Sequence, residues 1–157
     1  VKVVDAGNSA GRIIFIDNQN YNNGIQLNQI NGPESDLPVT FIFSALKPVV
    51  LTGTITGNVR MFFAGDFQFG MGTETVAYNG LTMFMSNGDM KICSSIWSYK
   101  NNPGGGFLSS DKDITIVESA SFQGQIQCRG NFKTSGLIQF NDSVLKAPGF
   151  TVPKGMK

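Results

Sequence analysis

Carboxylates are the side chains of this sequence best suited to acid–base chemistry, because the chain contains no histidine. Without imidazole, the Ser-His-Asp and Cys-His arrangements and the usual imidazole metal ligands are excluded. Two facing carboxylates could still hydrolyse a glycoside. Most candidates fall at predicted strand ends or in turns, where Asp caps local backbone groups: Asp66, Glu74, Asp89, Asp111, Asp113, Glu118 and Asp142. We therefore expect a protein that is not an enzyme.

Cys93 and Cys128 are the two cysteines of the chain. A disulfide between them would close a loop of about 35 residues and stabilise the fold by a few kcal/mol. Alternation places Cys128 on the inward face of its strand, whereas Cys93 shares a face with Asp89 and Lys91. Features typical of an extracellular protein favour the disulfide, and two buried free thiols are the alternative.

Trp97 and Tyr99 alternate just before the polar, glycine-rich segment 101–106. Two aromatic rings on one strand face could form a platform for stacking sugars or an adhesive patch. The alternative is that both rings pack in the core or at its rim.

The sequence predicts no cofactor and no metal site. Residues 17–24 offer several amide oxygens, but their spacing misses the EF-hand pattern and only Asp17 is charged. The pair Asn23-Gly24 instead predicts a type I′ hairpin turn. No phosphate-binding loop, dinucleotide fingerprint or zinc pattern occurs.

The composition points to a neutral, polar surface. Charged residues make up 15% of the chain, against about 25% in a typical soluble domain, so Asn, Gln, Ser and Thr supply much of the polarity. Such a surface depends little on salt or pH, which favours an extracellular or particle-borne protein over a cytosolic enzyme. The net charge is +1 without a basic run, so we expect no nucleic-acid binding.

We also expect no membrane span, because no stretch approaches the roughly 20 apolar residues that would cross a bilayer. The chain opens at Val1 without the features of a signal peptide, which is consistent with a processed product.

Short apolar stretches predict a single all-β domain over residues 1–157, without an amphipathic helix. They are rich in Ile, Val, Phe and Thr, and clusters of Gly, Asn, Pro and Asp separate them. The predicted strands cover residues 12–17, 39–43, 49–55, 58–63, 81–85, 89–93 and 113–117. Residues 147–157 carry two prolines and are expected to form an extended tail.

Residues 122–128 alternate strictly, which predicts a half-buried strand with one face of amides. The pairs Gly130-Asn131 and Ser135-Gly136 should turn the chain between this strand and two further short ones. We expect the outward amides to form an assembly face. The outward residues are Gln123, Gln125 and Gln127, and the inward residues are Phe122, Gly124, Ile126 and Cys128.

A glycine precedes a short alternating strand at positions 57, 88, 124 and 136. A solenoid should show a fixed period, and these spacings are irregular. A β-sandwich of the jelly-roll or Greek-key type would show the same punctuation. We favour a solenoid-like coil of short strands over the sandwich.

Residues 78–90 and 113–145 resemble the β-helical domain of prepilin-like proteins associated with type IV pili. The matching positions are Asn87-Gly88-Asp89, Phe122-Gly124-Ile126, Gly130, Gly136 and Ile138-Phe140-Ser143-Leu145. Residues 1–17 also look like the entry into the globular domain of minor pseudopilins. The resemblance covers under half of the chain, which lacks the family's N-terminal apolar helix. It implies a structural or adhesive role at the cell surface, without a cofactor.

Together these observations predict a non-enzymatic, extracellular structural or adhesive subunit of a pilus-like surface filament. Its partners would be further copies or other filament subunits, and a glycan or protein on a host surface. Two alternatives stay open: a viral or phage capsid or tail subunit of jelly-roll type, and a carbohydrate-binding domain.

Overall fold

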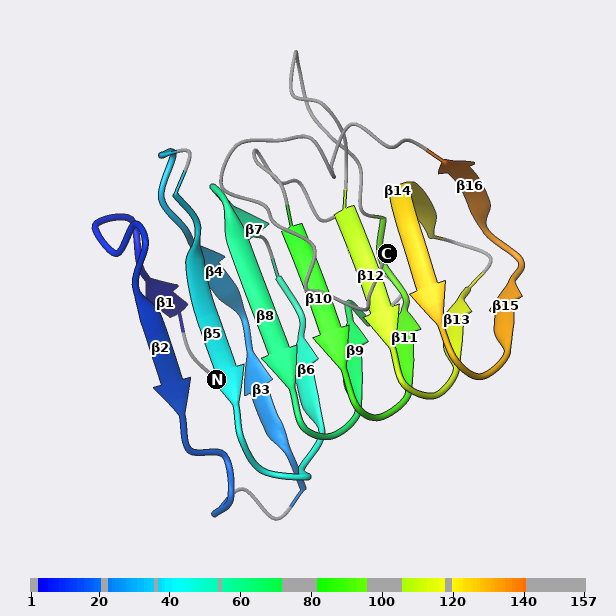
Figure 1. Cartoon of the computed structure of the whole chain (residues 1–157), viewed down its shortest axis with the longest axis horizontal. Helices are drawn as coiled ribbons and strands as arrows, with labels where there is room; N and C mark the ends of the chain where they lie inside the picture. The colour runs from blue at the N-terminus through cyan, green and yellow to red at the C-terminus, as the bar shows by residue number, and fades with distance from the viewer. Residues whose placement is uncertain are drawn as a thin grey trace.

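A computed structural model shows a chain that winds into a coil of short parallel strands, a β-solenoid (Figure 1). The structure describes residues 3–20, 23–35, 37–53, 55–71, 82–95, 106–117 and 120–140. None of these residues is in a helix. The predicted solenoid-like, all-β fold is therefore confirmed.

Three parallel sheets form the sides of the coil. Sheet A contains β1 (Val3–Asp5), β4 (Gln29–Asn31) and β7 (Ile55–Thr56). Sheet B contains β2 (Ile13–Ile16), β5 (Val39–Phe43), β8 (Val59–Phe63), β10 (Thr82–Ser86), β12 (Gly106–Ser110), β14 (Ser121–Cys128) and β16 (Leu137–Phe140). Sheet C contains β3 (Ile25–Leu27), β6 (Val49–Leu51), β9 (Phe67–Phe69), β11 (Met90–Ile92), β13 (Ile114–Ile116) and β15 (Phe132–Thr134).

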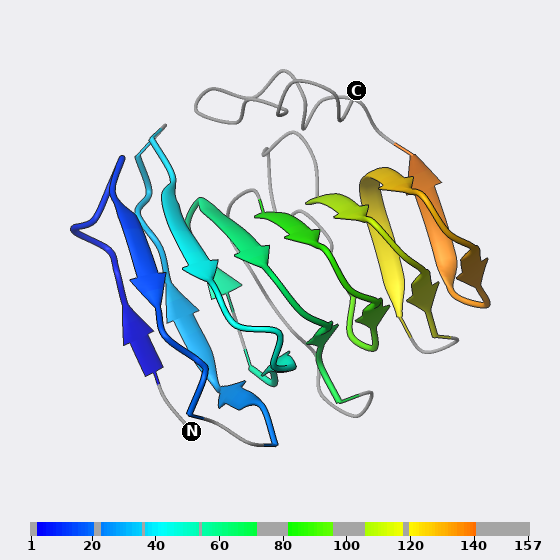
Figure 2. The same cartoon turned by 60° about the horizontal axis from the view of Figure 1, so that its bottom comes forward.

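Each strand pairs with a strand of the neighbouring coil and not with its neighbour in sequence (Figure 2). All pairings between the described strands are parallel. The jelly-roll alternative is wrong for this part of the chain, because a jelly roll is built from antiparallel strands. The predicted hairpin is also wrong: Gly24 has a turn-like φ of 88°, but it lies between β2 of sheet B and β3 of sheet C.

The coils differ in length although their strands stay in register. Successive partners along sheet B are residues 13, 40, 60, 83, 107 and 125, and in the last step residue 121 pairs with residue 137. One coil thus takes from 16 residues (121 to 137) to 27 residues (13 to 40). The strands carry the register, and the connections absorb the difference. This explains the irregular spacing of the glycines in the sequence.

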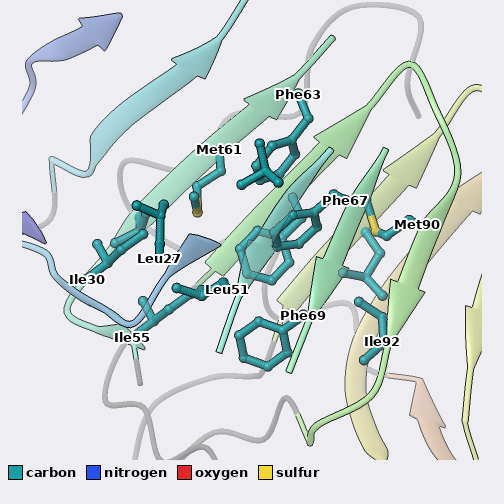
Figure 3. Packing of buried hydrophobic residues seen from close by; sticks show 14 of the residues in the cluster. Leu27, Ile30, Leu51, Ile55, Met61, Phe63, Phe67, Phe69, Met90 and Ile92 are labelled. Carbon is teal, nitrogen blue, oxygen red and sulfur yellow. The ribbon is translucent and has the colours of Figure 1, made fainter. Parts of the chain in front are cut away.

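Apolar side chains form continuous inward rows along the coil axis. In sheet B, one row consists of Phe41, Met61, Phe84 and Leu108, all of them buried. Aromatic rings bridge sheets B and C: the centroids of Phe63 and Phe67 lie 3.9 Å apart with planes 11° from parallel (Figure 3). Stacked aromatic pairs contribute about 0.5–1.5 kcal/mol beyond their area burial, so these rows hold adjacent sides of the coil together.

Carboxylates cap the corners at which sheet B turns into sheet C. The Asp89 backbone N–H donates to Asp66 Oδ1 at 2.8 Å, and the Asp113 N–H donates to Asp89 Oδ1 at 3.2 Å. The Asn131 N–H then donates to Asp113 Oδ1 at 2.8 Å. Each carboxylate thus binds the corner of the next coil, 18–24 residues along the chain, so the prediction that these aspartates cap local backbone groups is wrong.

Most predicted strands are present, and the shortest ones were missed. Residues 39–43 form β5 as predicted, whereas residues 49–55 divide into β6 and β7. Strands β1, β3, β4 and β9 have three residues each, too few for a periodic pattern to stand out. Strand β12 was missed because all five of its residues are buried, so it shows no alternation.

We expect Gly124→Ala to destabilise the coil by about 2–4 kcal/mol. Gly124 has a φ of 145°, and a Cβ atom there would overlap the Gly106 carbonyl oxygen of the paired strand β12. Gly7→Ala is the matched control, because its Cβ would meet only Asp5 Oδ1 at 3.6 Å. Urea unfolding of both variants tests this, and equal midpoints would contradict the argument.

Candidate functional site

A groove crosses the outer face of sheet B along the coil axis, with a volume of about 420 Å³. One row of register partners lines it, and these are Ile42, Phe62, Met85, Ser109 and Gln127. The row is apolar over β5, β8 and β10 and becomes polar over β12 and β14. The groove thus offers an apolar surface at one end and hydroxyl and amide groups at the other.

The charges at the groove compensate each other. At its polar end, Arg129 Nε lies 3.6 Å from Asp111 Oδ1, and both side chains are exposed. These two side chains form an ion pair within the described part of the chain. Beside the groove, Arg60 Nε donates to Thr40 Oγ1 at 3.1 Å, and burial lowers the pKa of the Arg60 guanidinium. The lining residues therefore carry little net charge.

The three predicted glutamines lie on the outer face of β14. Gln125 is the register partner of Phe107, and Gln127 is the partner of Ser109. Gln123, Gln125 and Gln127 are half-buried, whereas Phe122 and Gly124 are buried. The predicted alternation is confirmed over this part of the strand, and the role of the glutamines as an assembly face stays a prediction.

The predicted disulfide between Cys93 and Cys128 is wrong: no disulfide joins the two cysteines. Cys128 ends β14, where sheet B turns into sheet C, while Cys93 follows the far end of β11 in sheet C. Strand β13 separates β11 from β15, the strand that follows Cys128. Two strand spacings alone amount to about 10 Å, beyond the roughly 7 Å that a disulfide allows between Cα atoms.

Other predicted positions are either engaged in structure or lie outside the described residues. Asn18 is fully buried: its Oδ1 accepts from the Ala45 N–H at 2.9 Å, and its Nδ2 donates to the Lys47 carbonyl at 3.3 Å. It therefore binds a neighbouring corner and is not a calcium ligand. Within the described ranges, no three metal-ligating side chains cluster. Outside those ranges lie Trp97, Tyr99, Glu74, Glu118, Asp142 and residues 147–157.

The feature that sequence reasoning missed is the free edge of β2. Among the described strands, β2 is the last one of sheet B at its end and pairs only with β5. Its outward side chains are exposed, Ile13 by 59% and Phe15 by 72%. The sequence signal for this edge is the run of four apolar residues Ile13–Ile16, which contains no charge and no proline. Most edge strands carry a charge or a proline, which hinders pairing with another strand.

Comparisons with protein-family models, curated proteins and solved structures found no match to this chain. The resemblance to prepilin-like domains therefore stays a prediction. Over the residues that the structure describes, no helix is long and apolar enough to cross a membrane.

We expect the native protein at low concentration to have the same mass before and after reduction, because no disulfide joins Cys93 and Cys128. Iodoacetamide should modify the half-buried Cys128 first, and the buried Cys93 only after unfolding in urea. Mass spectrometry of peptides checks the order. A mass loss corresponding to a disulfide would contradict the structure.

Proposed function

We propose that this protein is a non-enzymatic, extracellular structural or adhesive subunit of a pilus-like surface filament. The observation that carries the proposal is the apolar, unprotected edge of β2. An exposed edge presents unpaired N–H and C=O groups and is a template for another strand. In β2 this edge is flanked by the exposed side chains of Ile13 and Phe15.

The parallel coil supports assembly into a filament. Its two ends differ, because one edge of sheet B belongs to β2 and the other to β14 and β16. Contacts between unlike ends produce open, repeating assemblies when they do not close into a ring. The capping of corners by Asp66, Asp89 and Asp113 supports a structural role for these carboxylates.

A capsid subunit is the weaker alternative. The predicted capsid or tail subunit was of jelly-roll type, whereas the described strands pair in parallel. A coil with open ends lends itself more readily to linear growth than to a closed shell.

We expect Phe15→Pro to abolish filaments seen by negative-stain microscopy while the chain stays folded. The Arg12 carbonyl accepts from the Thr40 N–H of β5, so by alternation the Phe15 N–H points to the free edge. Proline removes that donor and is tolerated at edges. Phe15→Thr is the matched control, because it shortens the side chain and keeps the N–H.

Circular dichroism and thermal melting should show that both variants are folded. If Phe15→Pro forms filaments equally well, the edge of β2 is not the contact between copies. A strictly monomeric unmodified protein at high concentration would overturn the filament role itself.

A second candidate function is the binding of a neutral glycan in the groove on sheet B. Its apolar end, with the half-buried ring of Phe62, suits the C–H faces of sugars, and its polar end offers the half-buried Gln127 for hydroxyl groups. The paired charges of Asp111 and Arg129 disfavour a strongly charged ligand.

We expect the protein to bind neutral oligosaccharides on a glycan array and to lose at least tenfold in signal on Phe62→Ala. Thr115→Ala, on the outer face of sheet C, is the matched control and should bind normally. No signal from the unmodified protein would remove this candidate.

A further inference from the structure

The two ends of sheet B are complementary in register. Strand β14 has eight residues, and within the described chain β16 pairs with residues 121–124 of it. On that side, residues 125–128 have no partner strand within the described chain. At the opposite end of the sheet, β2 occupies these same four rows, because the register connects Ile13 to Gln125 and Ile16 to Cys128 through the intervening strands.

The rows of inward side chains are also incompletely covered at both ends of the coil. Along the row of Ile14, the central residues from Phe41 to Leu108 are at most 1% exposed, while Ile14 and Ile126 at its ends are only half-buried. Along the next row, Ile16 and Cys128 are likewise half-buried at the two ends. The core thus lacks cover at the same two rows on opposite ends of the coil.

We propose that copies of this chain join head to tail, with β2 of one copy pairing in parallel with residues 125–128 of β14 in the next. This inference rests on the proposed filament role and specifies its contact. Ile14 then packs on Ile126, and Ile16 packs on Cys128, so that both inward rows continue from copy to copy.

The same contact between copies would also join the two ends of sheet C. Strands β3 and β15 are the two ends of that sheet, and the register places Ile25 in the row of Phe132. Phe132 is 38% exposed, and β3 of the incoming copy would cover it. On the outer face, Phe15 comes to lie beside Gln127, which brings the glutamines of β14 into the assembly contact.

Strand β16 competes with the incoming copy. Arg12 lies in the row of Phe140, so the residues that lead into β2 need the space at the end of β16. The contact therefore closes only when the last residues of β16 leave the sheet. Within the described residues, β16 covers one half of the edge of β14 and so acts as a partial cap.

Disulfide trapping tests the register directly. The test variant carries Ile16→Cys in a Cys93→Ala background, so Cys128 is the one native thiol. Paired residues on adjacent strands lie about 4.8 Å apart, within the Cα range of disulfides. Oxidation should produce a ladder of dimers, trimers and longer chains on a non-reducing gel, because every copy carries one thiol at each end.

Two controls use the alternation of the strand. Phe15→Cys in the same background places the thiol on the outer face, away from Cys128, and should give no ladder. Adding Cys128→Ser to the Ile16→Cys variant should also abolish the ladder. Thermal melting of each variant establishes that it is folded.

Each other outcome overturns the proposal in a distinct way. Filaments without a ladder would mean that the register is wrong while the filament role stands. Dimers that persist after Cys128→Ser would mean that two β2 edges pair with each other. The absence of both ladder and filaments would overturn the contact and the filament role together.

Discussion

The parallel register between successive coils is the constraint on which the rest of this structure depends. Each strand finds its hydrogen-bond partner one coil away, about 20 residues along the chain, and the same pairing aligns inward side chains into rows. A slip of one residue would turn every apolar row toward solvent. The buried rows of phenylalanine, methionine and leucine therefore hold the register, while the connecting segments vary in length.

The same repetition decides what the polar residues do. Where sheet B turns into sheet C, three successive corners present a backbone N–H at an equivalent position, and an aspartate of the preceding coil accepts from it. Asp66, Asp89 and Asp113 are thereby engaged with backbone N–H groups along the coil axis. The outer face of sheet B carries a groove that combines apolar and amide groups.

A coil of parallel strands has no intrinsic end. Each added coil covers the core of the previous one and exposes its own, so the last strands carry both unpaired backbone groups and half-buried apolar side chains. At one end these are Ile14 and Ile16, and at the other they are Ile126 and Cys128. Such an exposed end can be covered either by another copy of the chain or by a partial cap such as β16.

The sequence by itself determined the local features: the all-β character, the strands of four or more alternating residues and the amide face of residues 122–128. These follow from side-chain periodicity, which a few neighbouring residues specify. Only the tertiary structure decided that the strands run parallel, that Gly24 leads into another sheet, that Cys93 and Cys128 lie apart, and that β2 forms a free edge. Each of these depends on which coil lies beside which, and such pairing between residues far apart in the chain leaves no periodic trace in the sequence.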